Sequence, residues 1–510
     1  MQRGLSQLVE TEFLYQQGLP PQTTYLFKHT LIQEATYQSL LRSTRQQHHQ
    51  RIAQVLEERF PEFGATQPEL LAHHYTEAGL SAQAIPYWQR AGQRAIQRSA
   101  YPEAIAHLSK GLEVLGTLTD IPAHAQQELG LQIALGQTWM AAKGQGVPEV
   151  ERAYTRAHEL CQQMGETPEL FPVLWGLWRF YLVRAEYQTA RELAVQCLRL
   201  AQRDEDSALR LVAHHALGNT LYFFGEVSLA RAHLEQGIAL YDRQQHHHLA
   251  FHYGLDLGVW CLAYGAWPLW LLGYPEQALQ RSREALTLAR KLAHPFSLAH
   301  TLYYMAYLHY FRREWQAAQA QAEAAMALAS EKRFPQMVAV GMITRGWALA
   351  MQGQGREGIA QLQQGMAAFR AAAGDLDRPR YLAHLAEAYG QVGQTEAGLT
   401  TLAEALATAY KTGDRYWEAE LHRLKGELLL RQASPTKEVE ACFRQAIEIA
   451  RQQQAKSLEL RAATSLSRLW QQQGKRDEAR ALLAPVYGWF TEGFDTIDLQ
   501  EAKALLDALA

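Results

Sequence analysis

Histidine pairs and a triplet are the first residues in this chain that could perform chemistry, because imidazole nitrogens bind metals and transfer protons. They occur in the segments QHHQ, AHHY, AHHAL and QQHHHLA. A metal site needs side chains that converge on one point, whereas adjacent histidines on a helix point about 100° apart. We therefore expect solvated or core histidines and no metal site. The three histidines at 246–248, in a predicted loop, offer at most a weak, adventitious site for a transition metal.

Patterns of a catalytic nucleophile or a phosphate-binding loop are absent from the sequence. It contains no HExxH, GxSxG or GxxxxGK[ST] segment, and no acidic pair that follows a strand and could hold catalytic metals. Asp204 and Asp206 lie in the turn-like segment QRDEDSA, which indicates a solvated loop. We expect no catalytic residues, no cofactor and no catalysis by this chain alone.

Aromatic side chains are the most informative group. Tyr303, Tyr307 and Tyr310 fall at positions i, i+4 and i+7, so they share one face of a helix. Such a face offers stacking surfaces to a peptide or a small organic molecule, and it can equally fill a core between helices. Which of these applies depends on the elements that carry the tyrosines.

A repeat of about 40 residues supplies those elements. Its clearest copy is WQRAGQRAIQRSAYPEAIAHLSKGLEVL, in which Ala91, Gly92 and Ala104 combine with Trp88 and Leu108 at the spacings of tetratricopeptide helix pairs. Small residues let two antiparallel helices cross closely, and larger apolar residues fill the groove between them. Because no single pair can bury its own apolar face, neighbouring pairs must stack.

A small or apolar residue near the start of each second helix marks the copies of this repeat. These residues are Ala104, Ala153, Ala190, Ala230, Ala278, Ala318, Gly358, Gly398, Val439 and Ala479. Glycines five residues before four of them, Gly225, Gly353, Gly393 and Gly474, indicate tight turns with positive φ. The sequence therefore predicts an all-α, right-handed superhelical solenoid of about ten tetratricopeptide-like helix pairs. The segments KGQGVPEV and DRQQHHHLAFHYGLD lengthen two repeats, and we expect them to be loops.

The first helix of each pair lines the concave groove of such a solenoid. The repeat register places side chains from five consecutive repeats there, namely Trp175, Arg179, His215, Asn219, Tyr222, Trp260, Trp267, Trp270, Tyr303, Tyr307, Tyr310 and Trp347. For any one of the aromatic residues, burial between first helices is the alternative. As a group, with a few polar side chains among them, they predict a groove that binds a peptide, a partner segment or a small organic effector.

Segments at both ends of the chain add a resemblance to a known family. YLFKHTLIQEATYQSLLRSTRQQHHQRIAQVLEERFP, then PELLAHHYTEAGLSAQAIPYWQRAGQRA, and finally LQEAKALLDAL resemble the C-terminal half of large bacterial regulators of the STAND type. In that family a class III adenylate or guanylate cyclase domain, or another effector, precedes a P-loop ATPase, a winged helix and a tetratricopeptide sensor of the maltose-regulator type. The resemblance covers essentially the whole chain and implies a sensor region.

The resemblance also implies a division into segments. Residues 1–60 would be the C-terminal part of a winged helix with a connecting helix, containing a helix over GLSQLVETEFLYQQ and a short wing around GLPPQTTYLFKH. Residues 61–495 would be the repeat array, and residues 496–510 a capping helix. The beginning of the winged helix would lie upstream of Met1. Because the charges of residues 1–60 nearly cancel, we do not expect this truncated winged-helix remnant to bind nucleic acid.

The bulk composition is typical of a cytoplasmic protein without membrane spans. A net charge of −3, with 48% apolar and 20% charged residues, indicates a soluble chain that forms a core and has no bias toward polyanions. The 4 cysteines are far apart, which indicates reduced thiols. The uncharged stretch LGVWCLAYGAWPLWLLGY contains Pro268 and internal glycines, and the repeat register assigns it to a buried helix.

These observations together predict a non-catalytic sensor or protein-interaction region of a signalling regulator. It would bind a peptide, a partner protein or a small-molecule effector in its groove, and an upstream ATPase or cyclase module would be a further partner. The alternative is a fragment of a multidomain adenylate or guanylate cyclase, or of an ATPase, whose catalytic domains are encoded upstream. A stand-alone scaffold that binds a peptide also fits the repeats.

Overall fold

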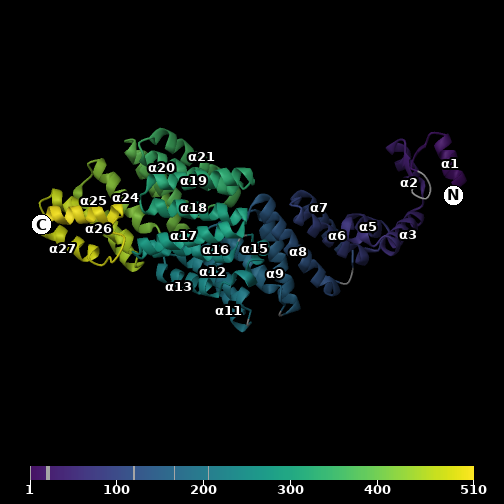
Figure 1. Ribbon diagram of the computed structural model, residues 1–510, viewed down its shortest axis with the longest axis horizontal. Helices are drawn as coiled ribbons and strands as arrows, with labels where there is room; N and C mark the ends of the chain where they lie inside the picture. The colour runs from purple at the N-terminus through teal and green to yellow at the C-terminus, as the bar shows by residue number, and fades with distance from the viewer. Residues whose placement is uncertain (1, 19–22, 119–120, 166, 205, 255) are drawn as a thin grey trace. The chain divides into compact units, whose positions relative to one another are not determined.

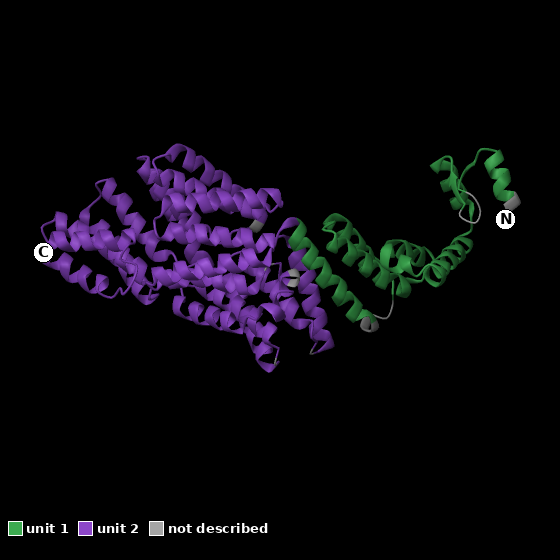
Figure 2. Cartoon of the chain, in the orientation of Figure 1, with its two compact units in different colours: residues 1–142 green, residues 143–510 purple. Residues whose placement is uncertain are grey.

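The described part of the chain is all-α apart from one small β-hairpin, and it is a solenoid of tetratricopeptide-like helix pairs, as predicted. The computed structural model describes residues 2–18, 23–118, 121–165, 167–204, 206–254 and 256–510. The chain divides into two compact units, residues 1–142 and residues 143–510, which Figure 2 shows in different colours.

The first unit consists of the hairpin and the helices that surround and follow it. Its elements are α1 (Gln2–Glu10), β1 (Leu14–Gln17), β2 (Thr24–Phe27), α2 (Thr30–Ser39), α3 (Arg42–Arg59), α4 (Glu62–Thr66), α5 (Pro68–Glu77), α6 (Ser81–Gln97), α7 (Tyr101–Leu115) and α8 (Ile121–Lys143). A core of Leu71, Ile85, Trp88, Leu108 and Leu131 joins α5, α6, α7 and α8.

The hairpin corrects one expected boundary. The sequence predicts a helix over residues 4–17, but α1 ends at Glu10 and the last four of those residues form β1. Glu12 has a φ of 60°, a left-handed conformation that stops a helix. Beyond it, Leu14 pairs with Phe27 in an antiparallel ladder with β2. Of the two strands, β2 lies in the segment where the sequence predicts a short wing, whereas β1 occupies the end of the predicted helix.

The second unit contains most of the repeats, labelled in Figure 1. Its elements are α9 (Pro148–Met164), α10 (Leu170–Val183), α11 (Tyr187–Arg203), α12 (Ser207–Phe223), α13 (Val227–Leu240), α14 (Arg243–His246), α15 (Leu249–Tyr253), α16 (Leu257–Leu271), α17 (Pro275–Leu292), α18 (Pro295–Phe311), α19 (Trp315–Glu331), α20 (Pro335–Met351), α21 (Gly355–Ala373), α22 (Arg378–Gln391), α23 (Thr395–Thr412), α24 (Glu418–Arg431), α25 (Thr436–Gln452), α26 (Lys456–Gln472), α27 (Arg476–Tyr487) and α28 (Ile497–Leu509).

The predicted repeat register is confirmed. Each marker residue is the fourth residue of its second helix, except Ala153, which is the sixth residue of α9, and all of the markers are buried. Gly358 shows why a small residue is needed there. A Cβ atom on Gly358 would lie 2.4 Å from the carbonyl oxygen of Gly346, so α20 and α21 cross backbone against backbone.

The turns between paired helices use one left-handed residue, as the glycine pattern predicts. Gly225, with a φ of 76°, and Gly353, with a φ of 91°, occupy this position. Ala185 and Arg313 take the same position with a φ of 59°, although an L-residue is strained there. The turn conformation is therefore common to the array, and glycine is the residue that adopts it without strain.

The insertion between α13 and α16 differs from the expected loop. It contains two short helices, α14 and α15. Asp242 explains the first of them, because its carboxylate accepts hydrogen bonds from the backbone N–H groups of Gln244 and Gln245 at the helix start. His246, one of the histidines at 246–248, is buried and bonds Ser207 at 3.0 Å.

The second unit closes on itself, because its later repeats lie against the turns of its earlier ones. The N–H of Arg415 donates to the carbonyl of Phe223 at 2.7 Å, and Arg461 donates to the carbonyl of Phe311 at 2.6 Å. Tyr187 donates to Asp414 at 3.2 Å, across more than two hundred residues of sequence. The concave side of the early repeats is therefore covered by other parts of the same unit.

The uncharged stretch that could be mistaken for a membrane span forms α16 and the turn that follows it. Trp260 and Trp267 of α16 are buried against α12 and α18. Across the described part of the chain, we find no helix whose length and apolar content would let it cross a membrane.

Candidate functional site

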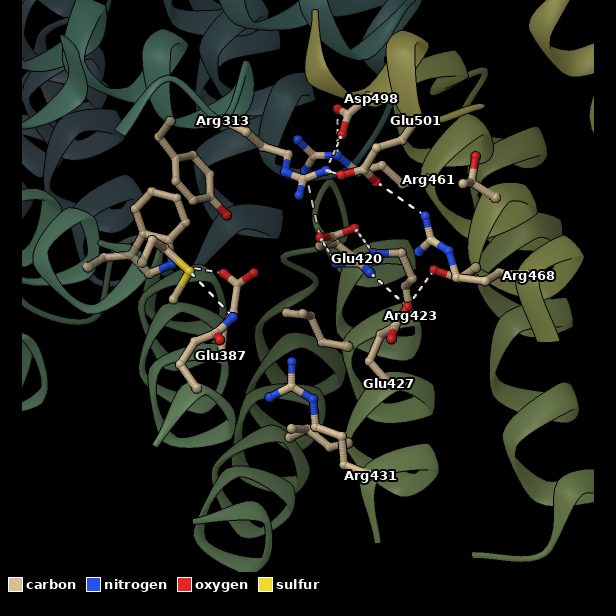
Figure 3. Close-up of a pocket in the computed structure, with 18 of the residues that line it drawn as sticks. Arg313, Glu387, Glu420, Arg423, Glu427, Arg431, Arg461, Arg468, Asp498 and Glu501 are labelled. Atoms are coloured by element: carbon tan, nitrogen blue, oxygen red, sulfur yellow. Dashed lines mark hydrogen bonds and ion pairs between the residues drawn. The ribbon is translucent and has the colours of Figure 1, made fainter. Parts of the chain in front are cut away.

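A pocket of about 380 Å³ lies within the second unit, and its wall is built by the first helices of consecutive repeats (Figure 3). Its lining comes from α18, α20, α22, α24, α26 and α28, with Trp315 added from α19 and Arg313 from the turn between α18 and α19. The charged residues around it are Arg313, Glu387, Glu420, Arg423, Glu427, Arg431, Arg461, Arg468, Asp498 and Glu501. Cations and anions are equal in number, so the pocket is polar without a net charge.

Helical spacing explains how these side chains face the same space. On α24, Glu420, Arg423 and Glu427 are three and four residues apart, so they lie on one face. On α26, Arg461 and Arg468 share a face in the same way. Because the first helices of stacked repeats run side by side, these faces line one wall.

Most of the charges are held in a single ion-pair network. Glu420 pairs with Arg423 at 2.7 Å and with Arg461 at 3.6 Å, and Arg461 pairs with Asp498 at 2.8 Å. Asp498 also contacts Arg313 at 3.3 Å. In Figure 3 Glu420 lies at the centre of this network. Since each charge holds its neighbours, the lining is fixed before any ligand arrives.

The network controls the protonation of its buried members. Burial opposes the ionisation of Glu420, but the guanidinium groups of Arg423 and Arg461 hold its pKa below the usual range. Glu387 behaves differently. Burial raises the pKa of Glu387, and the more distant Arg423 offsets this only in part.

Two charges of the lining stand outside the network. Glu387 accepts a hydrogen bond from the indole nitrogen of Trp347 at 2.8 Å, and Arg431 donates to the carbonyl of Gly390. Among the described residues, neither has an oppositely charged group within 4.0 Å. They are therefore the charges most available to a ligand.

The residues predicted for the groove all come from first helices, namely α10, α12, α16, α18 and α20. Every one of the twelve is buried, with Trp175 and Tyr303 the most exposed at 6%. Tyr310 and Trp347 line the pocket, with ring centroids 4.2 Å apart. The other ten are enclosed, because the later repeats cover the concave side, and they do not form an open surface in this structure.

The enclosed residues form a continuous aromatic core. Tyr303, Tyr307 and Tyr310 do lie on one face, with centroids 4.8 Å and 5.9 Å apart along the series. Trp267 contacts Tyr307, and Tyr222 contacts Trp267. Several polar atoms in this core lack a hydrogen-bond partner: Trp175 Nε1, Arg179 Nε and Nη1, both ring nitrogens of His215, both side-chain polar atoms of Asn219, and Trp260 Nε1.

A buried ion pair at the centre of the unit was not foreseen from the sequence. Arg380 and Asp377 contact each other directly, and Tyr416 donates to Asp377 at 2.6 Å. The guanidinium carbon of Arg380 lies 3.7 Å from the ring centroid of Tyr307. Burial opposes the charge of Arg380, yet Asp377 holds its pKa well above the usual value.

The charged lining of α22, α24 and α26 was also not predicted. The groove prediction covers only five repeats and selects aromatic residues, whereas these helices present arginine and glutamate. The signal that could have found them is the segment EAELHRLKGELLLR, where the same register places Glu420, Arg423 and Glu427 on the concave face.

Metal binding has no support among the described residues, where no cluster of three or more histidine, cysteine, aspartate or glutamate side chains could hold an ion. The 4 cysteines are buried and free. What the pocket offers is a set of fixed charges with three aromatic residues, Tyr310, Trp315 and Trp347, at its wall. Such a lining suits recognition of a polar or mixed-charge ligand.

A comparison with known proteins finds no model of a protein family that matches the chain. An uncharacterized protein of Rhizobium meliloti (strain 1021) is 28% identical over 466 residues, which are 91% of this chain and 45% of that protein. The chain thus spans less than half the length of that relative.

Solved structures show a likeness in fold. A Rap protein complexed with competence and sporulation factor has a TM-score of 0.52 at 14% identity, with 72% of this chain and 98% of that chain covered. A signal transduction ATPase of the STAND type with a tetratricopeptide repeat sensor, from Pyrococcus horikoshii, has a TM-score of 0.39 at 14% identity, with 75% and 54% covered. This chain therefore shares the helical-repeat fold of the Rap protein.

Proposed function

We propose that this chain is a non-catalytic, tetratricopeptide-type interaction region that senses a peptide or a peptide segment of a partner protein in the pocket of its second unit. The single observation that carries the proposal is the pocket lining. Charges of both signs, most of them on the first helices of consecutive repeats, face one space of about 380 Å³. A peptide offers matching charges and backbone groups along its length.

The fold likeness supports a binding role for the helical repeats. The Rap protein is complexed with competence and sporulation factor, and that protein covers most of this chain with a TM-score of 0.52. Repeat solenoids in general use the concave side for binding. By this reasoning the ligand of the present chain would lie against α22, α24 and α26, and its identity would be set by the charges on those helices.

The proposed setting is a cytoplasmic signalling regulator of the STAND type, in which ligand binding would bias the repeat array between two arrangements. A ligand shifts such an equilibrium only by binding one arrangement more tightly. The bias would pass through the N-terminal hairpin and helices to an ATPase or other effector module. The sequence resemblance at residues 25–61 supports this placement.

The test uses the full chain and a library of fluorescein-labelled hexapeptides of mixed charge, read by fluorescence anisotropy. Arg468→Glu changes an exposed arginine of the lining that pairs with Glu501 at 3.5 Å. Arg444→Glu is the matched control, since Arg444 pairs with Glu440 on the second helix α25, outside the lining. We expect Arg468→Glu to weaken the binding of the selected peptides at least tenfold. We expect Arg444→Glu to leave their binding unchanged. Equal effects of the two variants, or no binding peptide at all, would refute the proposal.

A second candidate is that the chain is the sensor part of a multidomain cyclase or ATPase. The observation that favours it is the length of the rhizobial relative, of which the matched region is only 45%. Reading the DNA upstream of the Met1 codon in the same frame tests this. A frame that encodes a GxxxxGK[ST] segment or a cyclase domain would support it, and a stop codon directly upstream would contradict it.

A further inference from the structure

Arg179, on α10, is a buried cation without an anion. Its side chain is 3% exposed, and its Nε and Nη1 atoms have no hydrogen-bond partner. Among the described residues, no carboxylate oxygen lies within 4.0 Å of its guanidinium nitrogens. A buried charge in this state is costly, and proteins almost always pair such a group.

The other buried arginines of the same unit are each paired with a carboxylate. Arg380 is paired with Asp377, and Arg312 is paired with Glu314 at 2.7 Å. Of the fully buried arginines that the structure describes, Arg179 alone lacks such a partner. The exception needs an explanation that is specific to its surroundings.

The surroundings of Arg179 are aromatic walls with free hydrogen-bond donors. Its guanidinium carbon lies 4.7 Å from the ring centroid of Trp260, on which His215 stacks at 4.4 Å. The indole nitrogens of Trp175 and Trp260 have no partner, nor do the two ring nitrogens of His215. These groups come from α10, α12 and α16, so three first helices direct unused polar atoms toward one region.

The histidines nearby do not supply a second charge. Burial, with the nearby Arg179 adding to it, lowers the pKa of His215 to about 3, and the same two causes lower the pKa of His300 to about 3. Both imidazoles are therefore neutral at physiological pH. The region carries one positive charge and several neutral donors.

We propose that Arg179 is the anchor of an internal binding site for a carboxylate, carried by a small organic acid or by the C-terminus of a peptide. A carboxylate matches the guanidinium in charge and in its planar, two-pronged hydrogen-bonding geometry. A dianionic phosphate would leave one negative charge uncompensated among the aromatic rings. A neutral donor of the surrounding wall, such as the indole N–H of Trp175, would complete the recognition of the second oxygen.

The insertion between α13 and α16 borders the aromatic wall of this site. The ring of Tyr253, on the short helix α15, covers Trp175 with centroids 4.8 Å apart. The insertion interrupts the repeat and adds a segment that the other repeats of the unit lack.

The experiment uses the full chain and two pairs of probes: 3-phenylpropanoate with its amide, and a phenylalanine-terminated tripeptide with its C-terminal amide. Binding is followed by the quenching of tryptophan fluorescence. We expect at least one acid to bind tenfold or more tightly than its amide. Tight binding of the small acid alone identifies a small-molecule site, and tight binding of the tripeptide acid identifies a peptide C-terminus. Equal binding of acid and amide in both pairs, or no binding by any probe, overturns the proposal. This outcome needs only the unmodified chain.

Variants of Arg179 distinguish a role in binding from a purely structural role. Arg179→Met should abolish the preference for the acid and raise the Tm of the ligand-free protein, because it removes an uncompensated buried charge. Arg231→Met is the matched control, since Arg231 also stacks on an aromatic ring, Tyr274, at 5.2 Å but belongs to the second helix α13. It should change neither property. A lower Tm for Arg179→Met, or retained preference for the acid, would show that Arg179 is structural.

This site and the charged pocket are independent proposals. The pocket is lined by α18 to α28, whereas Arg179 lies on α10. Arg468→Glu should leave the binding of the carboxylate probes unchanged, and Arg179→Met should leave the binding of the mixed-charge hexapeptides unchanged. The failure of either proposal can therefore be told from the failure of the other.

Discussion

The indole nitrogen of Trp347 donates a hydrogen bond of 2.8 Å to the carboxylate of Glu387, which joins α20 to α22 at the wall of the charged pocket. Burial raises the pKa of Glu387. The hydrogen bond orients the carboxyl group, and the raised pKa makes its charge sensitive to pH.

Glu387→Gln should stabilise the second unit at high pH. With a folded pKa above the ordinary 4.5, the folded state binds more protons than the unfolded state, so stability falls as pH rises through the interval between the two pKa values. The glutamine has no charge and keeps an acceptor for Trp347. We expect a gain on the order of 1 kcal/mol at pH 8 that vanishes below the ordinary pKa, measured by urea unfolding at several pH values. A gain that does not change with pH would contradict this explanation.

Asp377→Ala should destabilise the second unit strongly, because it leaves Arg380 charged and buried against Tyr307. Removal of one partner from a buried pair costs about 3–5 kcal/mol. Adding Arg380→Met to the same chain should recover a large part of that loss, since no unpaired charge remains. Chemical denaturation of both variants measures this coupling. A double variant less stable than Asp377→Ala would show that packing of the guanidinium, and not its charge, is what matters.

Ala433→Gly should stabilise the turn between α24 and α25. Ala433 has a φ of 55°, in the left-handed region. An L-residue in this conformation destabilises the fold by roughly 1 kcal/mol, whereas glycine adopts it without strain. Ala441→Gly is the control, because Ala441 is an exposed residue within the helix α25, where glycine costs about 1 kcal/mol. The two variants should shift the unfolding midpoint in opposite directions. Shifts of the same sign would mean that the φ value does not govern the effect.

His74 should make the first unit sensitive to acid. Burial lowers its pKa from 6.5 to about 4, and its Nδ1 lies 2.8 Å from Nδ1 of His49, an arrangement in which at least one ring must be neutral. Because the unfolded state binds more protons, stability is lost as pH falls from 6.5 toward 4.

We expect a loss on the order of 1 kcal/mol for the half-buried His74, seen as faster hydrogen exchange in α3 and α5 at pH 5 than at pH 7 after correction for the intrinsic rate. His74→Gln should remove this difference. The same difference in the variant would exclude His74 as its cause.

The local elements were predictable from the sequence because they depend on local signals. Ala318 and Gly358 mark helix starts because only small residues fit the crossings, and Gly225 marks a turn because the turn needs a positive φ. The boundary at α1 was missed because Glu12, an ordinary helix former, takes a left-handed conformation.

The site was only partly predictable because it depends on contacts between distant repeats. The register correctly places Trp260 and Tyr307 on first helices, but nothing local to them reveals that the later repeats cover them. That closure depends on pairs such as Tyr187 with Asp414, whose members lie more than two hundred residues apart. The burial of Arg380 and Asp377, which are only three residues apart, and the isolation of Arg179 depend on the same closure.

The closure also limits how the chain can evolve. Open solenoids change length by duplication or loss of whole repeats, since each repeat contacts only its neighbours. In the second unit, the last residue of α12 contacts Arg415 and the last residue of α18 contacts Arg461, so the end of each early helix is matched to one late repeat. Insertion of a repeat between them would bring every later turn opposite the wrong partner. Descendants of this gene should therefore keep the number of repeats in this unit and vary in the charges that those repeats carry.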